Sequence, residues 1–457
     1  MSRSSALLRR LFVLLTASVV VPLGLAGSSA AAASPTTTDP ASAGAGYLAR
    51  QLLGPNADHY NFPDTGGTAS PDEGNTIDGV LAMDAAGVSQ TAAARAMAYL
   101  ATKANVVDYL TFGGYSSAYA PGSLAKLALA AEAQDIDPHN VGGVDLIQSL
   151  KDEECPHAGN ASCADASDTG YFKDPDTMGG YQSLLTQGLA LIALSRTAAD
   201  KADAPAIAFP VKQRCSDGLY PADKPASSPC ATGDVETTAF VLQGLKAAGA
   251  PDAVGLVALK GRQKPSGGFA TKDGSGVANA NATAVAVQAL LAVGDTTGAG
   301  RGQAFLRTLQ FTCSDPEAAR GAVQLEAKVD KVTGARTYDA DSALRATTQA
   351  VQALAGKPLA SITSTGASAG SPVLDCSTPS SSGGTSQAPP TTASPASASS
   401  SPTGSAPVAA AVPGGVLPFT GPTLLGRVVP LVVSGAGLLV LGGLLTAAGS
   451  RRRSRAL

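Results

Sequence analysis

One apolar segment recurs six times along the chain, and this repeat limits the folds that are possible. Within Asp234–Gly249, residues Val235, Thr238, Leu242 and Leu245 are spaced like one face of a helix. The other faces are also mostly apolar, so this helix should be buried nearly all round. Close copies lie at Asn279–Gly294 and Ala346–Leu354, and weaker copies lie at Asn75–Gly87, Gly122–Ala133 and Tyr181–Ser195.

The intervals between these helices each have room for a second, more polar helix. Gly-aromatic turns such as 217–220 and 267–269 join them, because glycine permits a positive φ and lets the aromatic ring fold beneath the turn. The turns at 112–115 and 179–181 are of the same kind, and no alternating strand pattern appears. We predict an all-α (α/α)6 toroid over residues 42–376. Pro210 makes one of the polar helices doubtful, because proline breaks the hydrogen bonding of a helix interior. The polar helices are expected at Tyr47–Leu53, Thr91–Lys103, Val144–Leu150, Pro205–Arg214 (the one with Pro210), Ala253–Gln263 and Gln303–Gln310.

The repeat resembles the α/α-toroid domains of squalene and other terpenoid cyclases, protein prenyltransferase β-subunits, cobalamin carriers and complement-type thioester domains. The segment Gln263–Phe269 is similar to the cyclase repeat Gln-x-x-x-Gly-x-Trp, with Phe269 in place of Trp. The resemblance covers residues 42 to 356 and implies a closed barrel of helices. A generic helical solenoid remains the alternative.

The segment beginning at Asp234 also resembles the Asp-x-Asp-Asp-Thr-Ala segment of class II terpene cyclases. In that family the middle acid protonates an alkene or epoxide; here Glu236 holds its position and Thr237 replaces the last acid. Cyclases stabilise carbocations largely with aromatic faces, and this chain has no Trp and only 4% aromatic residues. Acids at a helix start also stabilise the helix dipole. We therefore expect no catalysis, with Asp234 and Glu236 as the candidates if the protein is a cyclase-like enzyme.

Further acid pairs precede other apolar helices. Asp339 and Asp341 form one pair, and Asp174 and Asp176 form another, and N-capping accounts for both. If the barrel closes, these helix starts meet at one mouth, which is a common place for a ligand site. The sequence therefore predicts that a cation or polar ligand binds a ring formed by Asp234, Glu236, Asp339 and Asp341.

Several other functions are disfavoured by missing residues. Prenyltransferase β-subunits hold zinc with an Asp, a Cys and a His in the later repeats, and no His follows His157. The thioester motif Gly-Cys-Gly-Glu-Gln does not occur, and a net charge of −3 without a clustered basic face gives no basis for nucleic-acid binding. We predict neither metal nor cofactor. The favoured function is a non-catalytic binding protein for a small hydrophobic or cofactor-like ligand or a wall polymer; a cyclase-like enzyme and a structural or adhesive wall scaffold are the alternatives.

The start of the chain and a long segment near its end do not look globular. An arginine-containing start precedes the apolar run Leu11–Leu25, and Ala31–Ala33 offers a cleavage site, so residues 1–33 are predicted to be a secretory signal peptide. From 377 to 415 the composition falls to Ser, Thr, Pro, Ala and Gly, which predicts a disordered stalk. Residues 34–41 are expected to be similar.

The last part of the chain, 417–457, resembles the cell-wall sorting signal that sortases read. Leu417-Pro418-Phe419-Thr420-Gly421 precedes an uncharged stretch at 428–448, long enough to cross a bilayer, and a basic tail. The resemblance implies that a sortase cleaves after Thr420 and joins it to peptidoglycan. We expect a protein at the surface of a Gram-positive-type bacterium, anchored to the wall or held in the membrane by the C-terminal helix. A plain transmembrane anchor is the alternative.

Six cysteines fit an exported protein, because disulfides persist outside the cytoplasm. Six cysteines allow 15 pairings. We favour pairing of neighbours, since two of the pairs would then close short loops that contain Asp, Gly and Pro. A metal site is the competing interpretation, but no Cys-x-x-Cys occurs. The predicted pairs are Cys155 with Cys163, Cys215 with Cys230, and Cys313 with Cys376.

Overall fold

The computed structural model describes most of the chain between Ser34 and Ser377. The predicted signal peptide, the stalk beyond Ser377, the sorting signal and the apolar stretch at 428–448 lie outside the described residues. Within the described part, no helix has the length and apolar character needed to cross a bilayer. The described residues are 34–62, 70–116, 118–156, 163, 165–174, 183–197, 199–224 and 230–377.

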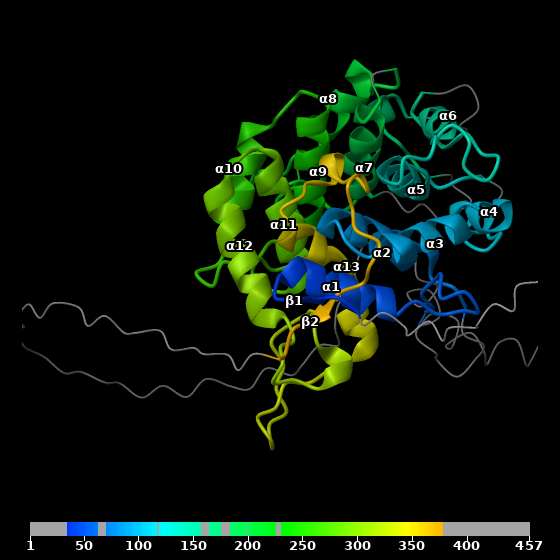
Figure 1. Cartoon of the computed structure of the whole chain (residues 1–457). Helices are drawn as coiled ribbons and strands as arrows, with labels where there is room; N and C mark the ends of the chain where they lie inside the picture. Colours follow the sequence, from blue (N-terminus) through cyan, green and yellow to red (C-terminus); the bar gives the residue numbers. More distant parts are fainter. Residues whose placement is uncertain are drawn as a thin grey trace, which may run out of the picture. The chain divides into compact units, whose positions relative to one another are not determined.

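Six apolar helices form a closed inner ring (Figure 1). Each packs against the next along the chain, and the last, α13, packs against the first, α2, so the ring closes without a gap. All six were expected from the repeat, and the toroid is confirmed. The inner helices are α2 (Glu73–Ala86), α5 (Pro121–Ala133), α7 (Leu184–Ser195), α9 (Val235–Ala247), α11 (Ala280–Ala292) and α13 (Ala340–Leu354).

More polar helices surround this ring, as predicted, but two boundaries and one helix differ from expectation. Helix α1 starts at Pro40, where Asp39 caps it by accepting from the Ser42 amide at 2.8 Å. Helix α12 starts at Thr296 rather than Gln303, and α4 was not predicted at all. The outer helices are α1 (Pro40–Arg50), α3 (Gln90–Leu100), α4 (Lys103–Thr111), α6 (Leu146–Asp152), α8 (Ala204–Lys212), α10 (Ala253–Gly261) and α12 (Thr296–Leu309), with 3-10 turns η1 (Ala166–Asp168), η3 (Glu317–Ala319) and η4 (Leu359–Ser361).

Pro210 lies inside α8 without ending the helix. A proline has no amide to bond the carbonyl four residues earlier, which here belongs to Ala206. The side chain of Gln187, from inner helix α7, donates to that carbonyl at 2.8 Å and to Gly170 O at 2.8 Å. The inner ring therefore supplies the hydrogen bond that the proline removes.

The turns that lead into the inner helices share one hydrogen bond. A threonine in the first turn or two of the helix accepts the backbone amide of a turn residue, as Thr238 does from Tyr220 at 2.8 Å and Thr283 from Phe269 at 2.8 Å. Both aromatic rings are fully buried, as predicted. The turn at 112–115 differs, because Tyr115 is 61% exposed. The same bond joins Thr76 to Tyr60 and Thr347 to Val323.

Small residues let the inner helices approach closely, as the Ala- and Gly-rich composition suggested. Between α7 and α9, a Cβ added at Gly244 would lie 2.5 Å from the carbonyl oxygen of Gly188. A Cβ at Gly188 would lie 2.5 Å from the backbone of Phe240. Neither glycine leaves room for a side chain, so both fix the spacing of these helices.

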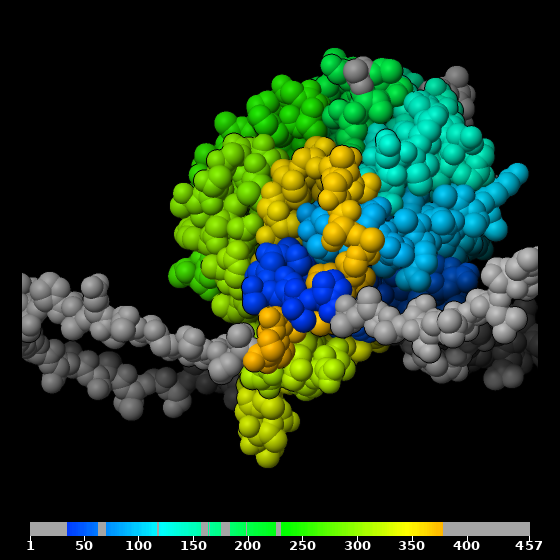
Figure 2. All heavy atoms as spheres, viewed as in Figure 1, coloured from blue at the N-terminus to red at the C-terminus, as the bar shows by residue number. Residues whose placement is uncertain are grey.

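A segment from Gly356 to Pro372, which we call the strap, crosses the end of the barrel where the inner helices finish (Figure 2). Leu359 and Ile362 are buried, and Arg196 donates to Leu359 O at 3.2 Å and to Ile362 O at 2.9 Å. After the strap, β2 (Val373–Leu374) pairs in parallel with β1 (Thr36–Thr37). The expectation that residues 34–41 are disordered was therefore wrong, because this pairing orders them.

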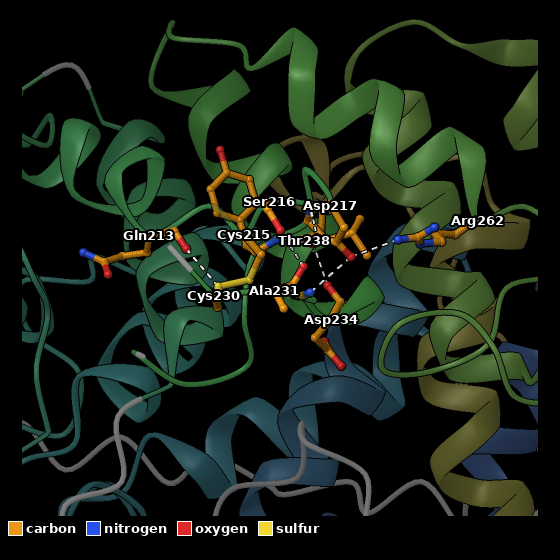
Figure 3. Close-up of a disulfide and its surroundings, with 12 residues drawn as sticks. Gln213, Cys215, Ser216, Asp217, Cys230, Ala231, Asp234, Thr238 and Arg262 are labelled. Carbon is orange, nitrogen blue, oxygen red and sulfur yellow. Dashed lines mark hydrogen bonds and ion pairs between the residues drawn. A yellow bond between two sulfur atoms is a disulfide. The ribbon is translucent and has the colours of Figure 1, made fainter. Parts of the chain in front are cut away.

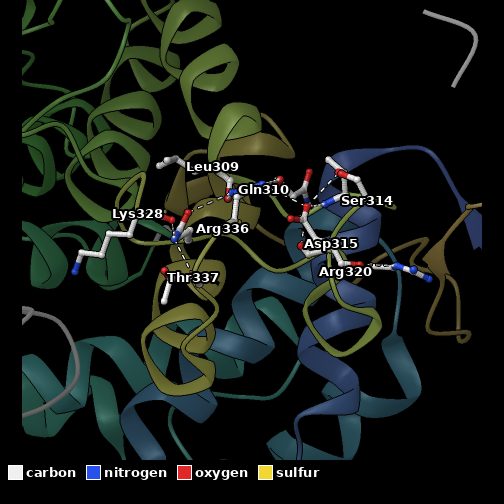
Figure 4. Close-up of polar contacts among 11 residues, drawn as sticks. Leu309, Gln310, Ser314, Asp315, Arg320, Lys328, Arg336 and Thr337 are labelled. Atoms are coloured by element: carbon white, nitrogen blue, oxygen red, sulfur yellow. Dashed lines mark hydrogen bonds and ion pairs between the residues drawn. The ribbon is translucent and has the colours of Figure 1, made fainter. Parts of the chain in front are cut away.

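All three predicted disulfides form: Cys155–Cys163, Cys215–Cys230 and Cys313–Cys376. Polar contacts also join the loop after α12 to the start of α1 (Figure 4). Gln310 donates to Pro40 O at 2.8 Å and to Gly321 O at 2.9 Å, while Arg336 donates to Gln310 O at 2.6 Å. These contacts hold the N-terminal outer helix against the last repeat.

Candidate functional site

Each inner helix turns one face toward the barrel axis, and side chains from these faces fill the centre. Among the described residues near the axis lies a small cavity of about 10 Å³, room for about one water molecule. Leu359 of the strap lies at its lower side, toward the helix ends. Eleven residues line this space. We call six of them, one from each inner helix, the floor: Asp78, Lys126, Leu189, Phe240, Val285 and Gln349.

One helical turn above the floor, toward the helix starts, lies a second set of inward positions. Residues four apart share a helix face, so the residue four places before each floor residue also faces the axis. We call these six positions the rim. In ring order, α9 stands opposite α2 and α11 opposite α5, so Glu236 lies across from Gly74, and Asn281 across from Gly122. The rim consists of Gly74, Gly122, Leu185, Glu236, Asn281 and Arg345.

Glu236 is the acid of the rim. Its side chain is only 4% exposed, and its Oε1 has no hydrogen-bond partner among the described residues. Burial, and then the nearby charge of Asp234, raise the pKa of Glu236 to about 8. The carboxyl is therefore mostly protonated at neutral pH. A protonated carboxyl held in this way is suited to donate a proton.

Asp234 stands two residues before Glu236 and caps α9. Its Oδ1 accepts the Thr237 amide at 2.7 Å, and its own amide donates to Tyr220 O at 2.7 Å. Burial raises the pKa of Asp234, although hydrogen bonds from the first turn of the helix oppose the shift. Figure 3 shows Asp234 at the end of the loop closed by the Cys215–Cys230 disulfide. This loop is further tied by Asp217, which accepts from Gly233 N at 3.3 Å and Arg262 Nη2 at 2.9 Å.

Asn281 is the neighbour of Glu236 on the next inner helix. It is 1% exposed, and neither its Oδ1 nor its Nδ2 has a partner within the described part of the chain. An amide buried without partners costs free energy, so such a group in a folded protein calls for an explanation. A polar ligand at the rim would satisfy both of its atoms.

Charged pairs fix the opposite side of the rim. Arg345 donates to Asp72 Oδ2 at 3.1 Å, and Asp72 also accepts from Asn75 N at 2.9 Å and Nδ2 at 2.6 Å. On the floor, Lys126 Nζ lies 2.9 Å from Asp78 Oδ2 and donates to Gly74 O at 2.9 Å. Both side chains of that ion pair are almost fully buried, so the floor is held rigidly.

The acids proposed as a ring lie in different environments. Glu236 is buried and Asp234 is half-buried, whereas Asp339 and Asp341 are exposed. When the repeats are aligned on their equivalent threonines, the counterpart of Glu236 on α13 is Arg345 and not Asp341. Helix α13 therefore extends one turn further toward its N-terminus than α9 does. Asp339 caps α13 through the Ser342 amide at 2.8 Å. Asp174 is buried, which raises its pKa to about 7, and Asp176 lies outside the described residues.

The sequence did not identify Asn281, Arg345 or the two rim glycines. A signal was present, because Gly74, Glu236, Asn281 and Arg345 each stand two residues before the threonine that accepts the turn amide. Aligning the repeats on that threonine shows that the position two residues before it changes from one repeat to the next. Among the described residues, no group of three His, Cys, Asp or Glu side chains is placed to hold a metal ion.

No protein-family profile and no curated protein matches the chain. Solved structures do match it. A protein from Actinoplanes is 16% identical and has a TM-score of 0.45, with 69% of this chain and 98% of that chain covered. A wild-type glycosidase is 15% identical, with 70% and 97% covered and a TM-score of 0.43. An unsaturated glucuronyl hydrolase from Bacillus sp. GL1, responsible for glycosaminoglycan degradation, is 13% identical, with 69% and 95% covered and a TM-score of 0.44. Overlays at this level give no residue correspondence with this chain.

The prediction of a non-catalytic binding protein for a small hydrophobic or cofactor-like ligand or a wall polymer was wrong. Such a ligand needs an open, apolar-walled cavity along the barrel axis, whereas the cavity that the floor residues border measures about 10 Å³. The matching structures whose activity is stated above are glycosidases.

Proposed function

We propose that the toroid is a glycoside hydrolase that acts at its rim, with Glu236 as the general acid and Asp234 as the base. The observation that carries the proposal is Glu236 itself: it is buried, lacks a partner for Oε1 within the described chain, and has a pKa of about 8. Cleavage of a glycosidic bond usually needs a pair of carboxyl groups, one acting as acid and the other as base. The reaction class is taken from this carboxyl pair.

The chemistry needs only water as a second reactant. Glu236 gives its proton to the glycosidic oxygen as the bond between that oxygen and the anomeric carbon breaks. Asp234 takes a proton from the water molecule whose oxygen joins the anomeric carbon. Burial raises the pKa of Asp234, which makes its carboxylate a better base. Solvent then returns both groups to their starting protonation states.

The direct test is release of reducing sugar by the full-length protein from peptidoglycan glycan strands, arabinogalactan and a glycosaminoglycan. We expect release from at least one polymer, and a loss of roughly 100-fold or more in the Glu236→Gln variant, in line with removal of a general acid. Glu317→Gln, at an exposed position remote from α9 in sequence, is the matched control. Equal rates in wild type and Glu236→Gln, or no release from any polymer, would contradict the proposal.

We also propose that the protein is exported and tethered outside the cell through Thr420, where such polymers lie. Three disulfides in the folded domain support an oxidising location. In a sortase-containing host, Thr420→Ala is expected to move the protein from the wall fraction to the membrane or the medium. Thr403→Ala, in the predicted stalk, is the control and should leave the protein in the wall. Wall attachment that survives Thr420→Ala would refute the tether.

A further inference from the structure

We propose that a groove on the outside of the barrel, beside the start of α9, holds an acidic unit of the substrate. This assignment rests on the hydrolase function proposed above and names the class of its substrate, an acidic polysaccharide. Residues 261–264, at the end of α10, form one side of the groove, residues 273–275 form the other, and Thr232 completes it. We call it the side groove. Its volume is about 420 Å³, within the range of roughly 300–1,000 Å³ that is usual for small-molecule sites.

Two cationic side chains, Lys264 and Arg262, line the side groove. Lys264 is half-buried and makes no ion pair within the described part of the chain, whereas the nearby Lys260 pairs with Asp295 at 2.7 Å. Arg262 donates from Nη2 to Asp217 Oδ2 at 2.9 Å, yet its side chain is still 33% exposed (Figure 3). Carboxylates and phosphates accept strong hydrogen bonds from both kinds of cation. The side groove therefore favours an anionic group.

The other polar groups of the side groove suit sugar hydroxyls. Thr232 and Ser275 add two exposed hydroxyl groups. Asp273 accepts the Ser275 amide at 2.9 Å, and hydrogen bonds from Ser275, followed by the charge of Arg262, lower the pKa of Asp273. Its ionised carboxylate can accept further hydrogen bonds. A ligand that carries both an acidic group and hydroxyl groups matches this lining, and an acidic sugar is such a ligand.

The loop on one side of the groove is attached to α9. Lys272 O accepts the amide of Val235, the first residue of α9, at 2.7 Å. A Cβ at Gly274 would lie 3.1 Å from Arg262 Cβ, so the loop packs against the stem of this arginine. Lys272 is itself exposed and makes no ion pair among the described residues, which adds positive charge beside the groove. A sugar bound here lies next to the start of the helix that carries Glu236.

The first test measures binding by isothermal titration calorimetry to full-length protein that carries Glu236→Gln, so that no probe is cleaved. The probes are a hyaluronate decasaccharide, the same oligosaccharide with its carboxyl groups reduced to alcohols, and pentamannose 6-phosphate. We expect at least one acidic probe to bind tenfold or more tightly than the reduced probe, and the comparison of the two acidic probes separates carboxylate from phosphate recognition.

The outcomes distinguish the side groove from the hydrolase. Equal affinity for charged and reduced probes, or no binding of either acidic probe, would overturn the groove assignment, even if the wild type releases reducing sugar from another polymer. Selective binding of an acidic probe, with no release of reducing sugar by the wild type from any polymer, would sustain the groove and overturn the hydrolase.

Substitutions locate the binding. Lys264→Gln should weaken binding of the acidic probe roughly two- to fivefold, as loss of one exposed ion pair does, and Lys264→Glu should weaken it further. Lys246→Gln, exposed in the last turn of α9 at the opposite end of the barrel, is the matched control and should leave the affinity unchanged. A Cβ at Gly261 meets nothing within 4 Å, so Gly261→Asp adds a carboxylate without a clash and should weaken binding more than neutral Gly261→Asn. Unchanged affinity in both Lys264→Glu and Gly261→Asp would place the anion elsewhere and overturn the assignment.

Discussion

Replacing Glu236 by Gln should make the protein more stable, by an amount that grows with pH. The folded-state pKa of Glu236 is about 8, against an ordinary value of 4.5, because burial disfavours its charge. At about 1.36 kcal/mol for each pH unit between those values, ionising the buried carboxyl costs roughly 5 kcal/mol. Glutamine has nearly the same shape and is never charged, so the variant does not incur this cost.

The direction of this pH dependence follows from the number of protons that the folded and unfolded chains bind. Below about pH 4.5 the carboxyl is protonated in both the folded and the unfolded chain, and the variant gains nothing. Between pH 4.5 and about 8 the folded state binds more protons than the unfolded state, so the unfolding free energy of wild type falls as pH rises. Above pH 8 the difference between variant and wild type reaches its plateau. Other buried acids, such as Glu73, shift both proteins equally and cancel in the difference.

The assay is urea unfolding of both proteins, with disulfides intact, followed by circular dichroism from pH 5 to pH 9. We expect midpoints that nearly coincide at pH 5 and a variant that is more stable by several kcal/mol at pH 9. Glu317→Gln, at an exposed glutamate, should give a flat difference. A difference for Glu236→Gln that is independent of pH, or that grows toward acid, would refute the idea that the carboxyl is held protonated.

Two further changes test the packing of the ring. Gly244→Ala places a Cβ 2.5 Å from a backbone oxygen of α7 and should lower the unfolding free energy by about 1–3 kcal/mol. The control, Gly261→Ala, places a Cβ that meets nothing within 4 Å and should raise the unfolding free energy by about 0.5–1 kcal/mol. Equal midpoints for the two variants in thermal denaturation would refute close packing at Gly244. Lys126→Met leaves the buried carboxylate of Asp78 without its cation and should lower the unfolding free energy by about 3–5 kcal/mol at neutral pH. Adding Asp78→Asn should recover most of this loss. If the losses of the two substitutions simply add, the two side chains do not act as a pair.

The fold was largely predictable from sequence because its signal is repeated. Each inner helix is apolar on nearly every face, and six such segments bury one another only by closing into a ring. Outer helices were harder, because one exposed face leaves a weaker pattern. Helix α4, which lies between α3 and the turn at Phe112, gave no such pattern, and α1 begins in a Pro-, Ser- and Gly-containing stretch that looks like linker.

The sequence predicted which acids lie at helix starts, but not how far along the barrel axis each of them lies. Sequence placed Asp234, Glu236, Asp339 and Asp341 at helix starts, but it did not show that α13 begins a turn early and carries its acids outside the rim. It also did not show that the strap and the floor close the barrel below Glu236.

Repetition also explains where the candidate site lies. Five of the six floor positions hold apolar groups or the ion-paired side chains of Asp78 and Lys126, so the floor serves packing. One turn higher, two glycines face a protonated acid and an unpartnered amide. Glu236 Oε1 and both polar atoms of Asn281 lose water without gaining a partner in the described protein, which costs free energy of folding. A repeat under selection for stability alone would hold alanine or leucine there, as Leu185 does on α7. The cost at Glu236 and Asn281 is therefore best accounted for by a substrate that restores their hydrogen bonds.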